Sequence, residues 1–210
     1  MTRRLFSVYG DSISTFEEIT PKGWSIFYTG EQREATGVQT PADTWWMQVI
    51  RTLGGAYLSN ISISGNTICT EGKMGGFPPQ RLLQLTAEGK TPDHILLYAG
   101  LNDVMFYIPP AVFQAEYLQL LTNLKQIYPK AQVHCGTLIL GEIPGTVNSL
   151  RGIIQRAEPY NAIIRQAVAE TGYHLVDLAA LRGRYHALDA FHPNRDGMAQ
   201  LAQLWLRAMK

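Results

Sequence analysis

The sequence predicts a three-layer α/β/α sandwich built around a parallel sheet. Short apolar or β-branched runs, typical of buried strands, alternate with longer segments of helical periodicity. Strands separated by helices are joined by right-handed crossovers into a parallel sheet that helices cover on both faces. With 210 residues, 46% of them hydrophobic, the chain can bury one sizeable core, so we expect a single domain over residues 1–210.

Five strands and four helices are expected from these patterns. The strand candidates are residues 5–9, 56–63, 94–99, 132–138 and 174–176. One helix starts after a cap at Asp43 or Thr44 and stops at Gly54. The others are expected at residues 111–129, which have the clearest amphipathic pattern, at 159–172, and from about residue 194 to the end.

Residues 13 to about 43 fit no clean period and are expected to form a long irregular loop. Loops of this length in compact domains are usually functional or disordered, and this one leaves directly from Ser12. We therefore expect a wall or lid over a binding site, with Trp24 and Tyr28 as candidate substrate contacts. At least one of Trp45 and Trp46, on the helix that follows, is expected to belong to the core.

Charge and composition exclude several partners. The chain has 18 Lys and Arg against 17 Asp and Glu, without a block of like charge, which argues against nucleic acid and anionic membranes. No apolar run is long enough to span a bilayer, and no signal peptide is visible, so we expect a cytoplasmic protein with a small-molecule partner. Cys69 and Cys135 lack zinc-ligand spacing and are expected to be buried thiols. The oligomeric state is not predicted.

The residues that follow the predicted strands form a set that could carry out chemistry together. Ligands of such sheets bind beyond the carboxyl ends of the strands. Ser12 follows the first strand, Gly65 the second and Asn102 the third, while Asp189 and His192 lie in the loop after the fifth.

These residue types suit nucleophilic catalysis. A serine hydroxyl needs an adjacent base, and histidine has a suitable pKa. A carboxylate three residues before His192 could orient the imidazole, which points to Asp189. The main-chain N–H groups of Ser12 and Gly65 and the amide of Asn102 could donate to an oxyanion.

Four motifs that contain these residues resemble the four blocks of the SGNH (GDSL-type) hydrolase family. They are YGDSIS with Ser12, NISISGNTI with Gly65, YAGLNDV with Asn102, and DAFHPNRDG with Asp189 and His192. The resemblance spans the chain in order. It implies a flavodoxin-like five-stranded sheet, Ser12 as nucleophile, His192 as base, Asp189 as its orienter, an oxyanion hole of Ser12, Gly65 and Asn102, and neither cofactor nor metal.

Local rivals exist for two of these roles. His186 also lies three residues from Asp189, but the His-Pro-Asn context favours His192. Asp177 ends the fifth predicted strand and could orient a histidine, although the spacing favours Asp189.

The remaining polar candidates are interpreted as structural. Asp11 and Asp103 are expected to bond loop amides near the site. The remaining histidines lie at or near strand starts: His94, His134 and His174.

The expected function is ester hydrolysis by a serine enzyme through an acyl-enzyme. Short acyl groups, particularly acetyl on carbohydrate, are the first expectation because of the aromatic segment. Lysophospholipid or thioester cleavage and acyl transfer use the same residues, and the sequence does not separate them. A dinuclear metallophosphoesterase would need a D-x-H motif and a further histidine that the sequence lacks. A non-catalytic carbohydrate-binding relative is disfavoured because every catalytic residue type is present.

Overall fold

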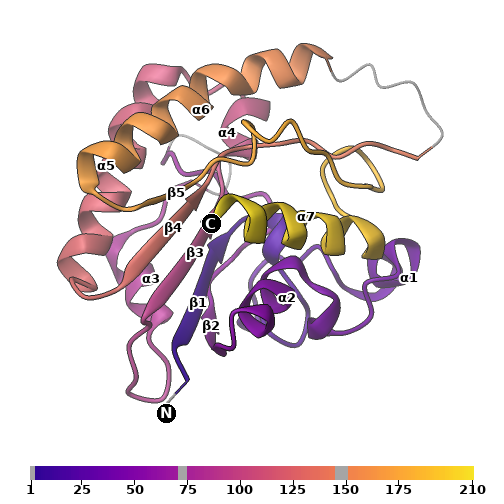
Figure 1. The fold of residues 1–210 in the computed structure, drawn as a ribbon, viewed down its shortest axis with the longest axis horizontal. Coiled ribbons are helices and arrows are strands. Elements are labelled where there is room, and N and C mark those ends of the chain that lie inside the picture. The colour runs from indigo at the N-terminus through magenta and orange to yellow at the C-terminus, as the bar shows by residue number, and fades with distance from the viewer. Residues whose placement is uncertain (1–2, 71–74, 145–150) are drawn as a thin grey trace.

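The computed structural model describes residues 3–70, 75–144 and 151–210, which contain one five-stranded parallel sheet (Figure 1). The strand order is β2-β1-β3-β4-β5, and every neighbouring pair is parallel. This is the flavodoxin-like order, so the predicted fold class is confirmed. The strands are β1 (Leu5–Gly10), β2 (Ala56–Asn60), β3 (His94–Tyr98), β4 (Gln132–Gly136) and β5 (His174–Val176).

Helices cover both faces of the sheet. Helices α2 and α7 pack together on one face, and α5 and α6 pack together on the other (Figure 1). The α-helices are α1 (Gly30–Thr36), α2 (Trp45–Thr52), α3 (Pro79–Leu82), α4 (Leu101–Met105), α5 (Pro110–Ile127), α6 (Arg151–Thr171) and α7 (Arg195–Ala208). The described residues also contain three short 3₁₀ turns: η1 (Ser12–Ser14), η2 (Pro41–Asp43) and η3 (Leu83–Leu85). Within the described residues, no helix is long and apolar enough to cross a membrane.

Helix α6 begins earlier than predicted. The prediction started it at Pro159 because proline is favoured in the first turn of a helix. The structure instead contains Pro159 inside the helix, on an exposed position. An apolar face at helical spacing, Ala157, Tyr160 and Ile164, runs across the proline and packs into the core. Packing of this face therefore outweighs the local stop signal.

The segment expected to be irregular contains regular structure. Helix α1 lies in its middle and ends at Gly37, which adopts φ +73°. Turn η2 then leads into α2, and Asp43 accepts hydrogen bonds from the main chain and hydroxyl of Thr40. The expectation of an irregular loop over residues 13–43 is thus wrong for its second half.

A tryptophan cluster supports the turn that follows β1. Trp45 and Trp46 are both fully buried, and Trp45 stacks on Trp205 with ring centroids 4.6 Å apart. The indole N–H of Trp45 donates to Ser14 Oγ (3.2 Å), and that of Trp46 donates to the Ser14 carbonyl (3.0 Å). Both tryptophans belong to the core, as do both cysteines of the chain, whose predicted burial is confirmed.

Candidate active site

Ser12 lies at the start of the tight turn that ends β1. Gly10 is required there because a Cβ atom would lie 2.6 Å from Ser14 Oγ and 3.0 Å from the Tyr98 carbonyl oxygen. Asp11 caps the turn by accepting the Ile13 N–H (3.1 Å). Ser12 itself is 8% exposed, so its hydroxyl is held at the carboxyl edge of the sheet with little contact with solvent.

A hydrogen-bonded series joins the serine, histidine and aspartate that were predicted to act together. Ser12 Oγ is 2.8 Å from His192 Nε2, within the distance that proton transfer requires. On the other side of the ring, His192 Nδ1 is 2.7 Å from Asp189 Oδ2. The loop before α7 thus brings Asp189 and His192 to Ser12, 180 residues away in the chain.

The carboxylate of Asp189 is held by its own loop as well as by the ring. Its Oδ1 accepts the main-chain N–H groups of Phe191 (3.1 Å) and His192 (2.9 Å). Partial burial opposes ionisation, but the hydrogen bonds from His192 and the backbone outweigh it and lower the pKa of Asp189 to about 2. Asp189 is therefore ionised at neutral pH and favours a proton on the facing nitrogen of His192.

Two other aspartates beside the site are buried and bond main-chain amides, as predicted. Asp103 accepts the N–H groups of Ile68 (2.9 Å) and Cys69 (3.0 Å). Burial raises the pKa of Asp103 and raises that of Asp11 to about 6. These carboxyl groups hold the loops around the site in place.

Besides Ser12, the residues predicted to bind an oxyanion follow β2 and β3. Gly65 has φ +79°, a conformation that favours glycine. Asn102 lies in the first turn of α4, where its side-chain amide donates to the Asn66 carbonyl (2.7 Å). The Asn66 side chain accepts a hydrogen bond from Arg81 (2.9 Å), a buried arginine that sequence reasoning missed. The 'PPQRLL' context of Arg81 carries no local signal of burial.

The two predicted substrate contacts differ in their surroundings. Tyr28 is fully buried and donates its hydroxyl to the Pro193 carbonyl (2.9 Å), an arrangement that argues against the predicted contact with substrate. Trp24 is half-buried, and the guanidinium of Arg81 lies 4.8 Å from its ring centroid. Its role as a substrate contact stays a prediction. Between these two, the ring of Phe27 stacks on His192, a contact that the sequence did not indicate.

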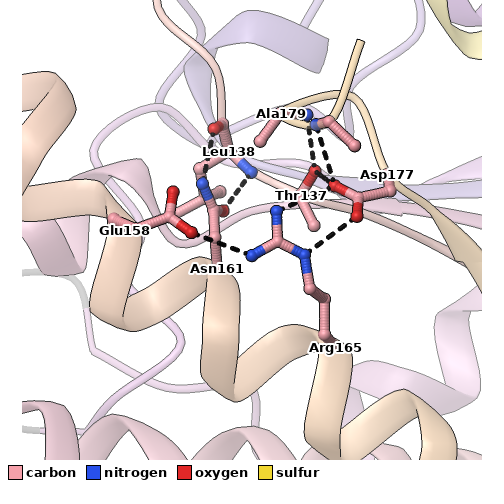
Figure 2. Close-up of polar contacts among 8 residues, drawn as sticks. Thr137, Leu138, Glu158, Asn161, Arg165, Asp177 and Ala179 are labelled. Atoms are coloured by element: carbon pink, nitrogen blue, oxygen red, sulfur yellow. Dashed lines mark hydrogen bonds and ion pairs between the residues drawn. The ribbon is translucent and has the colours of Figure 1, made fainter. Parts of the chain in front are cut away.

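His186 and Asp177, the alternative candidates for the base and its orienting carboxylate, make contacts outside the Ser12–His192–Asp189 series. The main chain of His186 pairs with the loop after β4 and donates to Gln200, while His192 alone of the two reaches Ser12. Asp177 forms an ion pair with Arg165 (2.8 Å) and accepts the Thr137 hydroxyl (3.0 Å) (Figure 2). These partners outweigh its partial burial and lower the pKa of Asp177.

Among the described residues, no group of three or more His, Cys, Asp and Glu side chains could hold a metal ion.

The strand order, together with the serine–histidine–aspartate series at the carboxyl edge of the sheet, defines an SGNH-type hydrolase fold. A family model supports the same class: residues 8–200 match the GDSL-like Lipase/Acylhydrolase family. The chain belongs to this family, and its function is accordingly that of a hydrolase.

The solved structures of similar fold include the following three. A GDSL-like lipase from Bacteroides ovatus is 21% identical, with a TM-score of 0.76 over 100% of this chain and 99% of the other. The psychrotrophic esterase EstA from Pseudoalteromonas sp. is 18% identical, with a TM-score of 0.62 over 98% and 96%. A carbohydrate esterase family 2 enzyme from Myceliophthora fergusii, with a carbohydrate-binding domain, is 19% identical, with a TM-score of 0.64 over 98% and 65%. No curated protein matches the chain significantly.

Proposed function

We propose that this protein is a carboxylic ester hydrolase that acts through an acyl-enzyme formed on Ser12. The observation that carries the proposal is the unbroken series from Ser12 Oγ to His192 (2.8 Å) and from His192 to Asp189 (2.7 Å). A serine held this way beside a base oriented by a carboxylate is an activated nucleophile.

In the proposed reaction, Ser12 Oγ attacks the ester carbonyl carbon and its proton passes to His192 Nε2. The oxyanion that forms accepts hydrogen bonds from the N–H groups of Ser12 and Gly65 and from the amide of Asn102. An amide nitrogen carries two hydrogens, so the bond from Asn102 to the Asn66 carbonyl fixes the side chain and leaves one hydrogen to donate.

Collapse of this intermediate expels the alcohol, which takes the proton from His192. A water molecule then attacks the acyl-enzyme, gives a proton to His192, and releases the carboxylic acid as the proton returns to Ser12. Asp189 stabilises the imidazolium in both halves of the reaction and does not itself take the proton.

Short acyl groups, acetyl above all, are the proposed substrates, with carbohydrate as the alcohol. Two points support this choice. The half-buried ring of Trp24 lies beside the loop that carries Gly65 and Asn66, through its contact with Arg81. A carbohydrate esterase is among the proteins of similar fold.

The first test compares p-nitrophenyl acetate hydrolysis by the wild type and Ser12→Ala. Loss of the nucleophile is expected to lower kcat by about 10⁴-fold or more. Ser59→Ala is the matched control: Ser59 lies on β2 and bonds the Gln84 carbonyl, so its loss should change kcat less than about twofold. Equal rates for wild type and Ser12→Ala would exclude the serine mechanism.

The substrate class is tested separately with acetyl, butyryl and octanoyl esters and with acetylated sugars. The proposal expects the highest kcat/KM on acetyl esters and measurable release of acetate from a sugar. A preference that rises with chain length would contradict the proposed acyl specificity while leaving the serine mechanism intact.

A further inference from the structure

Residues 24–28 contact the turn of the nucleophile, the loop after β2 and the base. At the oxyanion side, the Ser64 N–H donates to the Ser25 carbonyl (2.8 Å), directly before Gly65. Trp24 packs on the Arg81 guanidinium, which in turn holds the Asn66 side chain. The segment is therefore tied to the loop after β2 by both main-chain and side-chain contacts.

At the nucleophile side, the segment is tied to Ser12 through one buried hydroxyl. The Thr15 hydroxyl donates to the Ser12 carbonyl (2.9 Å), and its oxygen accepts the Phe27 N–H (3.0 Å). Thr15 is fully buried, and its bond to the Ser12 carbonyl is shielded from water, whereas the bond from Phe27 is partly buried.

At the base, Phe27 stacks on the ring of His192. The ring centroids are 3.5 Å apart and the planes are inclined by 6°. These contacts form a closed series that leads from Ser12 through Thr15 and Phe27 to His192 and back to Ser12 Oγ. The hydroxyl of the neighbouring Tyr28 holds the Pro193 carbonyl, one residue after His192.

We propose that residues 24–28 are a brace that holds nucleophile, base and oxyanion loops in register, with Phe27 as the positioning residue for His192. The inference rests on the proposed esterase function for its kinetic test. It assigns the aromatic segment to the geometry of catalysis, because Phe27 and Tyr28 contact the catalytic residues and their neighbours directly. Proton transfer depends steeply on the distance between the serine and the base, so a ring that fixes the imidazole plane affects turnover.

The test replaces Phe27 with leucine, which has similar bulk and no aromatic face. For Phe27→Leu, kcat on p-nitrophenyl acetate is expected to fall by about tenfold while KM changes less than about twofold. The conservative variant Phe27→Tyr keeps the stacked ring and should recover most of the lost kcat. A raised KM with unchanged kcat, or no change in either, would overturn the positioning role.

Phe6→Leu is the matched control for loss of a ring stacked on a histidine. Phe6 stacks on His94 with centroids 4.5 Å apart and planes inclined by 12°, away from the Ser12–His192 pair. The variant Phe6→Leu should have a kcat within about twofold of the wild-type value. An equal fall in both leucine variants would mean that Phe27 acts only through general stability.

A second measurement is independent of any ester substrate. Tyr28→Phe removes the hydroxyl that holds Pro193, and hydrogen–deuterium exchange then reports on the loop at residues 188–194. Faster exchange of this loop than in wild type supports the brace, and unchanged exchange contradicts it. If the wild type hydrolyses no ester, the esterase proposal fails while this measurement still decides the brace.

Discussion

Stacked histidines occur at both the amino edge and the carboxyl edge of the sheet, where the strands begin and end, but their surroundings differ. At the amino edge, rings from four neighbouring strands form a stacked ladder: Phe6, His94, His134 and His174, with successive centroids 4.5, 5.3 and 5.0 Å apart. At the carboxyl edge, His192 stacks on a phenylalanine in the same manner. Stacking alone therefore does not distinguish a histidine that can act as a base from one that fills a strand position.

Hydrogen-bond partners make the difference. In the ladder, His94 Nδ1 pairs with His134 Nε2 (3.0 Å), so the partner of each of these two rings is another imidazole. Burial, reinforced by the two neighbouring histidines, lowers the pKa of His134 to about 3. His192 instead faces the carboxylate of Asp189 on one nitrogen and a serine hydroxyl on the other. A carboxylate stabilises the imidazolium that forms during catalysis, whereas a second imidazole supplies no negative charge to do so.

A large effect is expected from removing that carboxylate. In Asp189→Asn, the amide oxygen can still accept the N–H groups of the loop, but it no longer stabilises a protonated His192. We expect kcat on p-nitrophenyl acetate to fall by about 10³–10⁴-fold.

Asp177→Asn is the control, because Asp177 is also a paired carboxylate near the end of a strand (Figure 2). Weakening its bonds to Arg165 and Thr137 should lower the free energy of unfolding by about 1–2 kcal/mol, while kcat stays within about twofold of the wild-type value. Similar losses of kcat in both variants would refute the assignment of Asp189.

The fold was largely predictable because its signals are local. Apolar runs located the five strands of the described sheet, a cap and a glycine stop located α2, helical periodicity located α5, and the last helix, α7, was also expected. The misses have physical causes. Helix α1 is short and its only buried residue is Thr36, so it has no apolar face to detect. In α6, long-range packing of its apolar face outweighed a local proline.

The site was predictable only in part. Motifs placed Ser12, Asp189 and His192 correctly relative to one another, since their spacing and order carry the information. The ring of Phe27 and the hydroxyl of Thr15 were missed, because their importance comes from contacts between segments far apart in the chain. An irregular aromatic segment offers no period from which such contacts could be read.

A second, smaller effect is expected at the ladder as the pH falls. The folded-state pKa of His134, about 3, lies below the ordinary histidine value of roughly 6.5, so the unfolded state binds the proton more tightly. Its contribution to stability is complete above about pH 6.5 and is lost as the pH falls from there toward 3. The free energy of unfolding should therefore decrease by up to about 1.4 kcal/mol per pH unit from this group.

His134→Gln isolates this contribution, because glutamine can bond His94 without titrating. Urea unfolding at pH 7 and pH 5 should show a weaker pH dependence in the variant than in wild type. Asp11, whose raised pKa of about 6 acts in the opposite direction, is present in both proteins and cancels in the comparison. Identical slopes would show that His134 does not carry the acid sensitivity.

The smallest effect is expected at His186, which shares with His192 a spacing of three residues from Asp189. The described contacts of His186 are made by its main chain: its N–H donates to Gln200 Oε1 (2.7 Å) and its carbonyl accepts the Asn194 N–H (3.1 Å). Asparagine can keep both bonds, so His186→Asn should change kcat less than about twofold, whereas His192→Asn should lower it by about 10⁴-fold. Parallel assays of the two variants on p-nitrophenyl acetate make the comparison. A large loss of kcat in His186→Asn would show that His186 is needed for catalysis and would contradict the assignment of His192 as the base.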